Sequence, residues 1–208
     1  NFSNEGTIQG GFRPLKNIMG LWLIQESRRQ WIREGADVSY ADLEREALAA
    51  KPFQCFINPD DPSFEMPGNL PRRVQEFCRK TGQPVPKNRG QVMRCVYESL
   101  ALKYRCSLEM LRGTTGKAYP ALHIVGGGTK DGFLCQLAAD ACGIPVTAGP
   151  IEATVLGNIA VQLIALGAIS SAAEARKIIA SSSEFRRFDP HPSPAWDDAY
   201  RRFRTLLP

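Results

Sequence analysis

The residues best suited to ligand chemistry are three consecutive glycines, Gly126-Gly127-Gly128, which follow a short apolar run at 121–125. Such a run is consistent with a strand buried on both faces, and a helical pattern begins near Asp131. Glycines let a nucleotide approach the main chain, and free N–H groups at a helix start favour an anion or a polar ligand edge. A plain tight turn is the alternative. The run is neither GxGxxG nor GxxxxGK[ST], so the Rossmann and P-loop classes are not indicated.

A second candidate turn, Gly149-Pro150-Ile151-Glu152, follows an expected strand at 145–148 and opens the next helix. The order strand, helix, strand, helix predicts a right-handed parallel crossover. Both turns are therefore expected at the carboxyl edge of one sheet, where ligands of open α/β sheets bind. Alternatively, Glu152 only stabilises the helix dipole, and Gly157 and Asn158 serve close helix packing.

Two polar residues accompany the first expected helix. Asn17 stands just ahead of it and Gln25 interrupts its apolar pattern. Asn17 as an N-cap and Gln25 as a solvent-facing side chain are the structural alternatives to a role in binding. We expect His123 in the core and His191 exposed, and no Ser/His/Asp or Cys/His constellation is legible.

The six cysteines form no CxxC pair, and with only two histidines a zinc site is not expected. Cys95, Cys106, Cys135 and Cys142 lie in apolar helical patterns, which predicts buried thiols. A bridge between Cys78 and Cys95 stays open as a minor alternative. Without a signal peptide, a reducing cytoplasm is the expected location.

The composition is that of a globular protein of one domain, or slightly more. The chain has 208 residues, 43% hydrophobic and 23% charged, which excludes a disordered tail and a fibre. The net charge of +5 is small and spread out, so nucleic-acid binding is not expected. The apolar stretch 151–169 contains polar residues that a bilayer would penalise, so it predicts a buried helix and no membrane contact.

Helical and strand patterns alternate in the second half of the chain. The expected helices span residues 17–34, 39–50, 69–81, 88–112, 131–142, 152–166, 171–181 and 194–207. The expected strands lie within 1–16 and at 55–57, 121–125, 145–148 and 185–189. Ser39 and Asp42 form a capping-box pattern, Gly143 is expected as the residue that ends a helix, and 51–68 reads as a proline-rich loop.

Several runs together resemble the FGGY family of carbohydrate kinases, most closely its members that phosphorylate L-rhamnulose. They cover nearly the whole chain and are Asn4–Gly6, Leu15–Leu23, His123–Gly128, Ala139–Gly143, Ala148–Ala153 and Leu156–Asn158. The resemblance implies an α/β fold of the actin-like, ribonuclease-H-like ATPase type, with a mixed sheet and helices on both faces. Residues 1–208 would be the C-terminal, nucleotide-binding domain, incomplete at its N-terminus and lacking its first strands.

That family transfers the γ-phosphoryl group of ATP to a sugar hydroxyl with Mg²⁺. The resemblance therefore implies ATP, Mg²⁺ and L-rhamnulose as ligands, with phosphorylation at O1 in cytoplasmic rhamnose catabolism. It also implies a preceding N-terminal domain that carries the catalytic base. No catalytic or metal-ligating residue is expected in this chain, which alone should be inactive.

Site residues follow from the resemblance position by position. Asn17 matches a sugar-contacting asparagine and Gln25 a glutamine near the nucleotide. Gly127, flanked by Gly126 and Gly128, matches the glycine beneath ATP.

Where the family often has an asparagine near the adenine, this chain has Asp131. An ionised carboxylate accepts hydrogen bonds but does not donate them, and its charge is unfavourable near phosphates.

Other functions stay open. The chain could be a catalytically inactive actin-like domain that binds a nucleotide or sugar, or part of another FGGY sugar kinase such as a fuculokinase. From composition alone, a helical scaffold or oligomerisation module also fits. A sheet that lacks strands exposes an edge, which would allow a homodimer.

Overall fold

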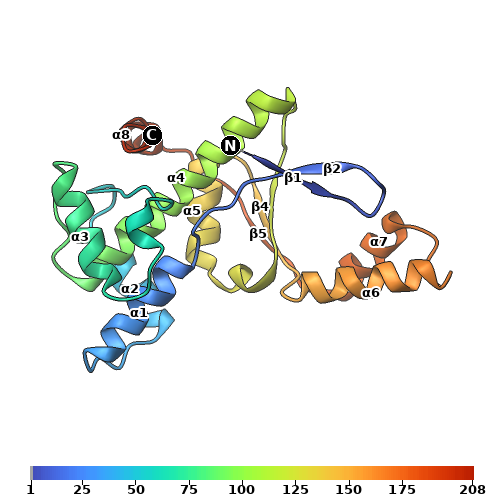
Figure 1. Ribbon diagram of the computed structural model, residues 1–208, viewed down its shortest axis with the longest axis horizontal. Helices are drawn as coiled ribbons and strands as arrows, with labels where there is room; N and C mark the ends of the chain where they lie inside the picture. Colours follow the sequence, from blue (N-terminus) through green and yellow to red (C-terminus); the bar gives the residue numbers. More distant parts are fainter. Residues whose placement is uncertain (1) are drawn as a thin grey trace. The chain divides into compact units, whose positions relative to one another are not determined.

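The computed structural model describes residues 2–208, which form two compact units (Figure 1). Unit 1 comprises the chain up to Gly116 together with Ala195–Pro208, and unit 2 comprises Lys117–Pro194. The elements of unit 1 are β1 (Ser3–Gly6), β2 (Phe12–Leu15), α1 (Trp22–Arg33), α2 (Tyr40–Ala49), η1 (Pro62–Phe64), α3 (Leu70–Lys80), α4 (Arg89–Thr115) and α8 (Pro194–Arg204). Those of unit 2 are β3 (Leu122–Ile124), η2 (Gly126–Lys130), α5 (Gly132–Cys142), β4 (Val146–Ala148), α6 (Ala153–Ala165), α7 (Ala172–Ser182) and β5 (Arg186–Phe188).

The start of unit 1 is an antiparallel hairpin, which agrees with the short strands predicted within residues 1–16. Strands β1 and β2 pair with Ser3 opposite Leu15. Helix α1 begins at Trp22, later than expected, because the chain turns through Gly20 with φ of +60°. Asn17 therefore lies outside the helix, and the N-cap alternative for Asn17 is wrong.

Helices α2 and α4 form the densest packing of unit 1. The predicted capping box is confirmed: the Ser39 hydroxyl accepts from the Asp42 N–H (3.1 Å) and the Asp42 carboxylate accepts from the Ser39 N–H (2.9 Å). At the start of α4, a Cβ on Gly90 would lie 2.4 Å from the Glu46 carbonyl oxygen of α2. Glycine is required there by the close approach of the two helices.

The loop 51–68 is buried at its centre, and the strand expected at Cys55–Ile57 is absent. Phe56 and Ile57 are fully buried. A buried main chain without strand partners needs side chains to complete its hydrogen bonds. Ser99 accepts from the Ile57 N–H (2.9 Å), and Gln83 bonds both polar groups of the Phe56 main chain (2.8 Å each).

The Glu98 side chain likewise accepts a main-chain hydrogen bond from the loop, at Phe53. Its carboxylate accepts from the Phe53 N–H (2.8 Å) and from the Arg94 guanidinium (2.5 Å), and only 1% of Glu98 is exposed. Burial raises the pKa of Glu98 to about 7, against the lowering effect of Arg94. The polar residues on the buried face of α4 thus substitute for a sheet.

In unit 2, the three-stranded mixed sheet has the order β3-β4-β5. Strands β3 and β4 are parallel, as predicted, and β5 is antiparallel to β4. Because β3 is an edge strand here, the expectation of burial on both faces is wrong. His123 is exposed and not a core residue, while Leu122 and Ile124 are half-buried.

Helix α6 is apolar but not buried, contrary to the sequence prediction. None of its residues is buried, and Val155 and Ile159 are 53% and 48% exposed. Helix α7 runs beside it (Figure 1). Among residues 2–208, no helix is both long and apolar enough to cross a bilayer.

We predict that Ser99→Ala destabilises the fold by about 1–3 kcal/mol, because the buried Ile57 N–H loses its acceptor. Chemical denaturation with an unchanged m-value measures this difference. The matched control is Ser107→Ala in the same helix, because the buried Ser107 hydroxyl makes no hydrogen bond within the described chain. Equal effects of the two substitutions would contradict the assigned role of Ser99.

Candidate functional site

The two predicted turns lie together at the carboxyl ends of β3 and β4. Two main-chain hydrogen bonds join them: the Gly126 N–H donates to the Pro150 carbonyl (3.0 Å), and the Gly149 N–H donates to the Ile124 carbonyl (2.9 Å). The expectation that both turns share one sheet edge is confirmed.

The glycine run folds as the short 3₁₀ helix η2 and not as an open loop. Gly126 adopts φ of +78°, a conformation that favours glycine. The Thr129 hydroxyl donates to the Gly126 carbonyl (2.8 Å), and the Arg186 guanidinium of β5 donates to the Thr129 carbonyl. Thr129 is also buried. Burial and these two hydrogen bonds fix the conformation of the turn without a ligand.

The main chain at Gly126 and Gly127 faces open space. A Cβ on Gly127 would meet no atom within 4 Å, and one on Gly126 would meet only the Ile151 carbonyl oxygen, at 3.9 Å. Backbone conformation explains glycine at Gly126, whereas nothing within the fold requires it at Gly127. A bare, exposed main chain at Gly127 suits a flat ligand that lies directly on it.

Asp131 caps helix α5. Its carboxylate oxygen Oδ1 accepts from the Leu134 N–H (2.9 Å). A carboxylate at this position occupies a donor of the first turn and places negative charge at the helix N-terminus. The arrangement disfavours a phosphate at the start of α5, so the turn is better suited to the uncharged part of a nucleotide.

Cys135 lies beneath the turn, buried in α5. Its sulfur is 3.9 Å from the Gly128 carbonyl oxygen. Burial, followed by the charge of Asp131, raises the pKa of Cys135 to about 11, so the thiol stays protonated and faces the carbonyl as a weak donor. The buried thiols predicted at Cys95 and Cys135 are confirmed, while Cys106 and Cys142 are half-buried; all six cysteines are free, so Cys78 and Cys95 form no bridge.

Around the second turn, structural roles predominate. A Cβ on Gly149 would lie 2.5 Å from the Glu184 carbonyl oxygen, so this glycine allows the approach of the chain leading into β5. Gly157 is exposed and a Cβ there would meet nothing within 4 Å, so the close packing expected at Gly157 and Asn158 is wrong. Glu152 stands at the N-cap position of α6, but its side chain makes no capping bond.

The sequence-predicted residues of unit 1 are Asn17 and Gln25. Asn17 is exposed and Gln25 is half-buried on α1. The segment that carries Asn17 is anchored through the Met19 N–H, which donates to the Asp60 carboxylate (3.0 Å). The other Asp60 oxygen binds the buried Lys103 ammonium at 2.8 Å.

Sequence reasoning missed this Asp60–Lys103 pair. Lys103 is 7% exposed on α4 and also donates to the Asn58 side chain (3.2 Å). The available signal was a lysine within the mostly apolar pattern of a long helix, because a buried charge requires a partner.

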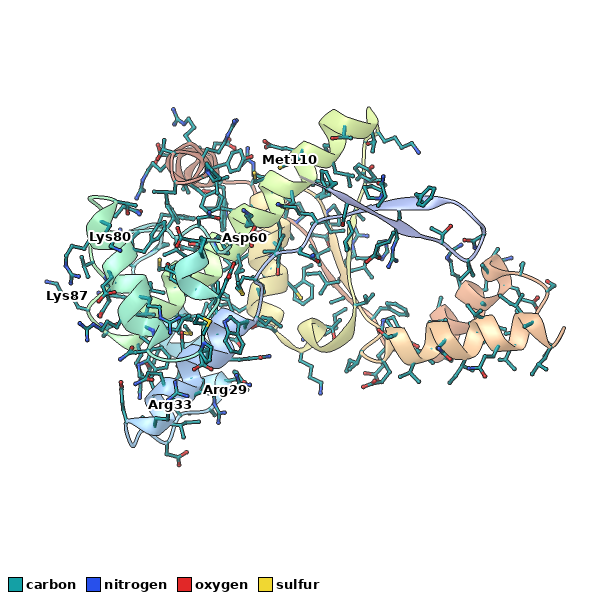
Figure 2. All side chains as sticks on the ribbon, in the orientation of Figure 1. Arg29, Arg33, Asp60, Lys80, Lys87 and Met110 are labelled. Carbon is teal, nitrogen blue, oxygen red and sulfur yellow. The ribbon has the colours of Figure 1, made fainter. Side chains whose placement is uncertain are left out.

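Helix α1 is fixed by a second buried carboxylate, that of Glu26. It accepts from the Gly68 N–H (3.0 Å) and pairs with Arg33 (2.8 Å) and Arg29 (3.2 Å). Figure 2 shows Arg29 and Arg33 on this helix. Burial raises the pKa of Glu26, but these hydrogen bonds outweigh burial, so the pKa lies below its ordinary value. The anchor holds the helical turn that carries Gln25.

Known proteins identify the family of this chain. The model of the C-terminal domain of the FGGY family of carbohydrate kinases matches residues 1–166. The chain belongs to this family.

Three curated relatives support the same family. The chain is 44% identical to a rhamnulokinase of Bacteroides thetaiotaomicron over 207 residues, covering 100% of this chain and 42% of the relative. It is 45% identical to a rhamnulokinase of Mannheimia succiniciproducens over 95% of this chain and 40% of the relative. It is 41% identical to a rhamnulokinase of Pectobacterium carotovorum over 99% of this chain and 41% of the relative. The chain thus spans about two fifths of the length of these FGGY relatives.

Solved structures show the fold. Xylulose kinase from Rhodospirillum rubrum matches with a TM-score of 0.68 at 20% identity, over 99% of this chain and 41% of that one. Ligand-bound xylulose kinase from Lactobacillus acidophilus matches with a TM-score of 0.63 at 15% identity, over 99% of this chain and 40% of that one. The α/β fold is therefore of the actin-like, ribonuclease-H-like type with a mixed sheet, as the FGGY resemblance implied.

We predict that Asp60→Ala costs about 3 kcal/mol of stability, because it leaves the Lys103 ammonium buried without its ion-pair partner. Hydrogen exchange at the Met19 amide should also become faster, since its acceptor is lost. Chemical denaturation and exchange mass spectrometry of the peptide around Met19 measure the two effects.

The double variant Asp60→Ala/Lys103→Met is the control. It removes the stranded charge, so it should recover stability while exchange at Met19 stays fast. A double variant as unstable as the single one would contradict the ion-pair account.

Proposed function

We propose that this chain is the nucleotide-holding part of an ATP-dependent sugar kinase that phosphorylates L-rhamnulose at O1 in rhamnose catabolism. The observation that carries the nucleotide role is the exposed main chain of Gly127, at which no contact of the fold requires a glycine. The rhamnulokinases at 41–45% identity support the choice of sugar.

In this proposal the nucleoside of ATP lies on Gly126, Gly127 and Gly128, and the phosphates extend away from Asp131. The Asp131 carboxylate would accept from the adenine amino group while it caps α5. Phosphoryl transfer depends mainly on alignment and charge stabilisation, so a rigid seat for the nucleotide is a direct contribution to catalysis. The hydrogen bonds from Thr129 and Arg186 supply that rigidity.

From the family resemblance, we propose that Asn17 contacts the sugar and that Gln25 lies near the nucleotide. The anchors at Asp60 and Glu26 would then set the positions of these two side chains. The catalytic base and a phosphate-binding loop would come from an N-terminal domain of the full-length enzyme.

We propose that this chain supplies no complete ligand set for Mg²⁺. The group of three metal-ligating side chains found in residues 2–208 consists of cysteines, whereas Mg²⁺ prefers oxygen ligands. We propose that Mg²⁺ enters with the phosphates of ATP. We also propose a cytoplasmic location, and a homodimer stays a prediction.

We predict that Gly127→Val in the full-length enzyme raises the KM for ATP about tenfold or more, because the side chain occupies the space of the nucleoside. The fold should remain intact, since a Cβ there meets no atom within 4 Å. Steady-state kinetics with both substrates varied, and thermal unfolding, measure these effects. The matched control is Gly113→Val, another glycine whose Cβ would meet nothing within 4 Å. An ATP KM as low in Gly127→Val as in Gly113→Val would refute the nucleotide seat.

We predict that the full-length enzyme uses L-rhamnulose with a higher kcat/KM than L-fuculose or D-xylulose, and that the 208-residue chain alone shows no measurable turnover. A coupled ADP-release assay with each ketose measures this preference. Preference for another ketose would overturn the substrate assignment but not the nucleotide seat, and turnover by the isolated chain would overturn the assignment of the base to another domain.

A further inference from the structure

Three cysteines from separate segments of unit 1 meet in its core. Cys55 comes from the buried loop, Cys78 from α3 and Cys95 from α4, and they are 3%, 0% and 2% exposed. Their sulfur atoms all lie within 4.8 Å of one another. The spacing of these cysteines in the sequence matches no metal-binding motif. The sugar kinase reaction proposed above does not involve them.

Hydrogen bonds from outside the cluster fix the main chain around Cys55 and Cys95. The loop on either side of Cys55 is fixed by Glu98 at Phe53 and by Gln83 at Phe56. The carbonyl of Cys95 accepts from the Ser99 hydroxyl at 2.6 Å. A group of thiols on rigid, converging segments is preorganised for a shared ligand.

The size of the cluster fits a metal ion at its centre. Metal–sulfur bonds to thiolates are about 2.3 Å long, so three sulfurs around an ion in one plane lie about 4.0 Å apart. Since no two of these sulfurs are more than 4.8 Å apart, no pair would have to approach by more than about 0.8 Å to reach that geometry.

We propose that Cys55, Cys78 and Cys95 form a three-sulfur site for a soft, low-coordinate metal ion, of which Cu⁺ is the biological example. Thiolate sulfur selects soft ions, and the cluster within residues 2–208 contains no histidine or carboxylate as a fourth ligand. Glu98 does not supply one, because its oxygens bind the Phe53 N–H and Arg94. A structural zinc site, which is usually tetrahedral, is therefore disfavoured.

A cavity of about 200 Å³ reaches the cluster. Its walls include the exposed Lys51 and Lys87 as well as the buried Cys55 and Cys95, so it extends from the surface to two residues of the cluster. Its wall also carries Arg94, whose guanidinium pairs with the Glu98 carboxylate on the same wall. The charges of Lys51 and Lys87 favour an ion that arrives as an anionic complex with a small thiol and is transferred by ligand exchange.

Binding displaces protons and transfers no electrons. Each thiol that becomes a ligand releases one proton to solvent, so up to three protons leave per ion. Occupancy would link the loop, α3 and α4, and would stabilise unit 1 in proportion to the logarithm of the free ion concentration.

The test uses the full-length protein, reduced and free of oxygen, with Cu⁺ supplied through a coloured chelator that competes for it. We expect one tightly bound Cu⁺ per chain, three sulfur neighbours in the X-ray absorption spectrum and a higher melting temperature. Cys55→Ser, Cys78→Ser and Cys95→Ser should each weaken binding about 100-fold or more, because even outer-shell partners of metal ligands are worth 10–100-fold.

Cys135→Ser is the matched control, since Cys135 is buried but belongs to unit 2. Equal Cu⁺ affinity in Cys78→Ser and Cys135→Ser would overturn the proposal. So would fewer than three sulfur neighbours, or a disulfide between two of the three cysteines in protein isolated without oxidant. If the variants fail to fold, the sulfur count and stoichiometry of the unaltered protein decide the matter alone.

Discussion

The hydrogen bonds between the turn after β3 and the turn after β4 are the constraint on which the candidate nucleotide site depends. Gly126 donates to Pro150 and Gly149 donates to Ile124, so neither turn can move without the other. Gly126 and Gly149 both adopt positive φ, at +78° and +136°, conformations that other residues adopt only with strain. The position of the bare main chain at Gly127 thus depends on a glycine in each of the two turns.

Unit 1 follows a different rule, in which buried polar side chains replace regular main-chain pairing. Main-chain N–H groups of the buried loop donate to the side chains of Ser99, Gln83 and Glu98. The Gly68 N–H donates to Glu26. The Asp60 carboxylate accepts from the Met19 N–H and pairs with Lys103. Each of these polar groups has a partner on another segment, because a buried group that loses its partner costs more than the contact itself contributes. The same converging segments bring the three thiols of Cys55, Cys78 and Cys95 together.

Features that depend on neighbouring residues could be predicted from the sequence. The capping box at Ser39 and Asp42, the end of α5 at Gly143 and the strand–glycine–helix order of the site are all local patterns. Three predictions that depended on tertiary partners were wrong, although the parallel pairing of β3 with β4 was confirmed. The strand at Cys55–Ile57, the burial of α6 and the core position of His123 each depended on which segments pack alongside. Asp60 and Lys103, 43 positions apart, leave only an isolated charge as a signal.

The most direct test of the nucleotide seat is hydrogen exchange of the full-length enzyme with and without an ATP analogue that is not hydrolysed. The account predicts slower exchange in the peptide spanning Ile124–Asp131, because the bound nucleoside would cover the main chain at Gly126–Gly128. NMR can measure the exchange rate of the Gly127 amide by itself, which should also fall when the nucleotide binds. Saturating nucleotide that protects other peptides but leaves this one unchanged would contradict the account.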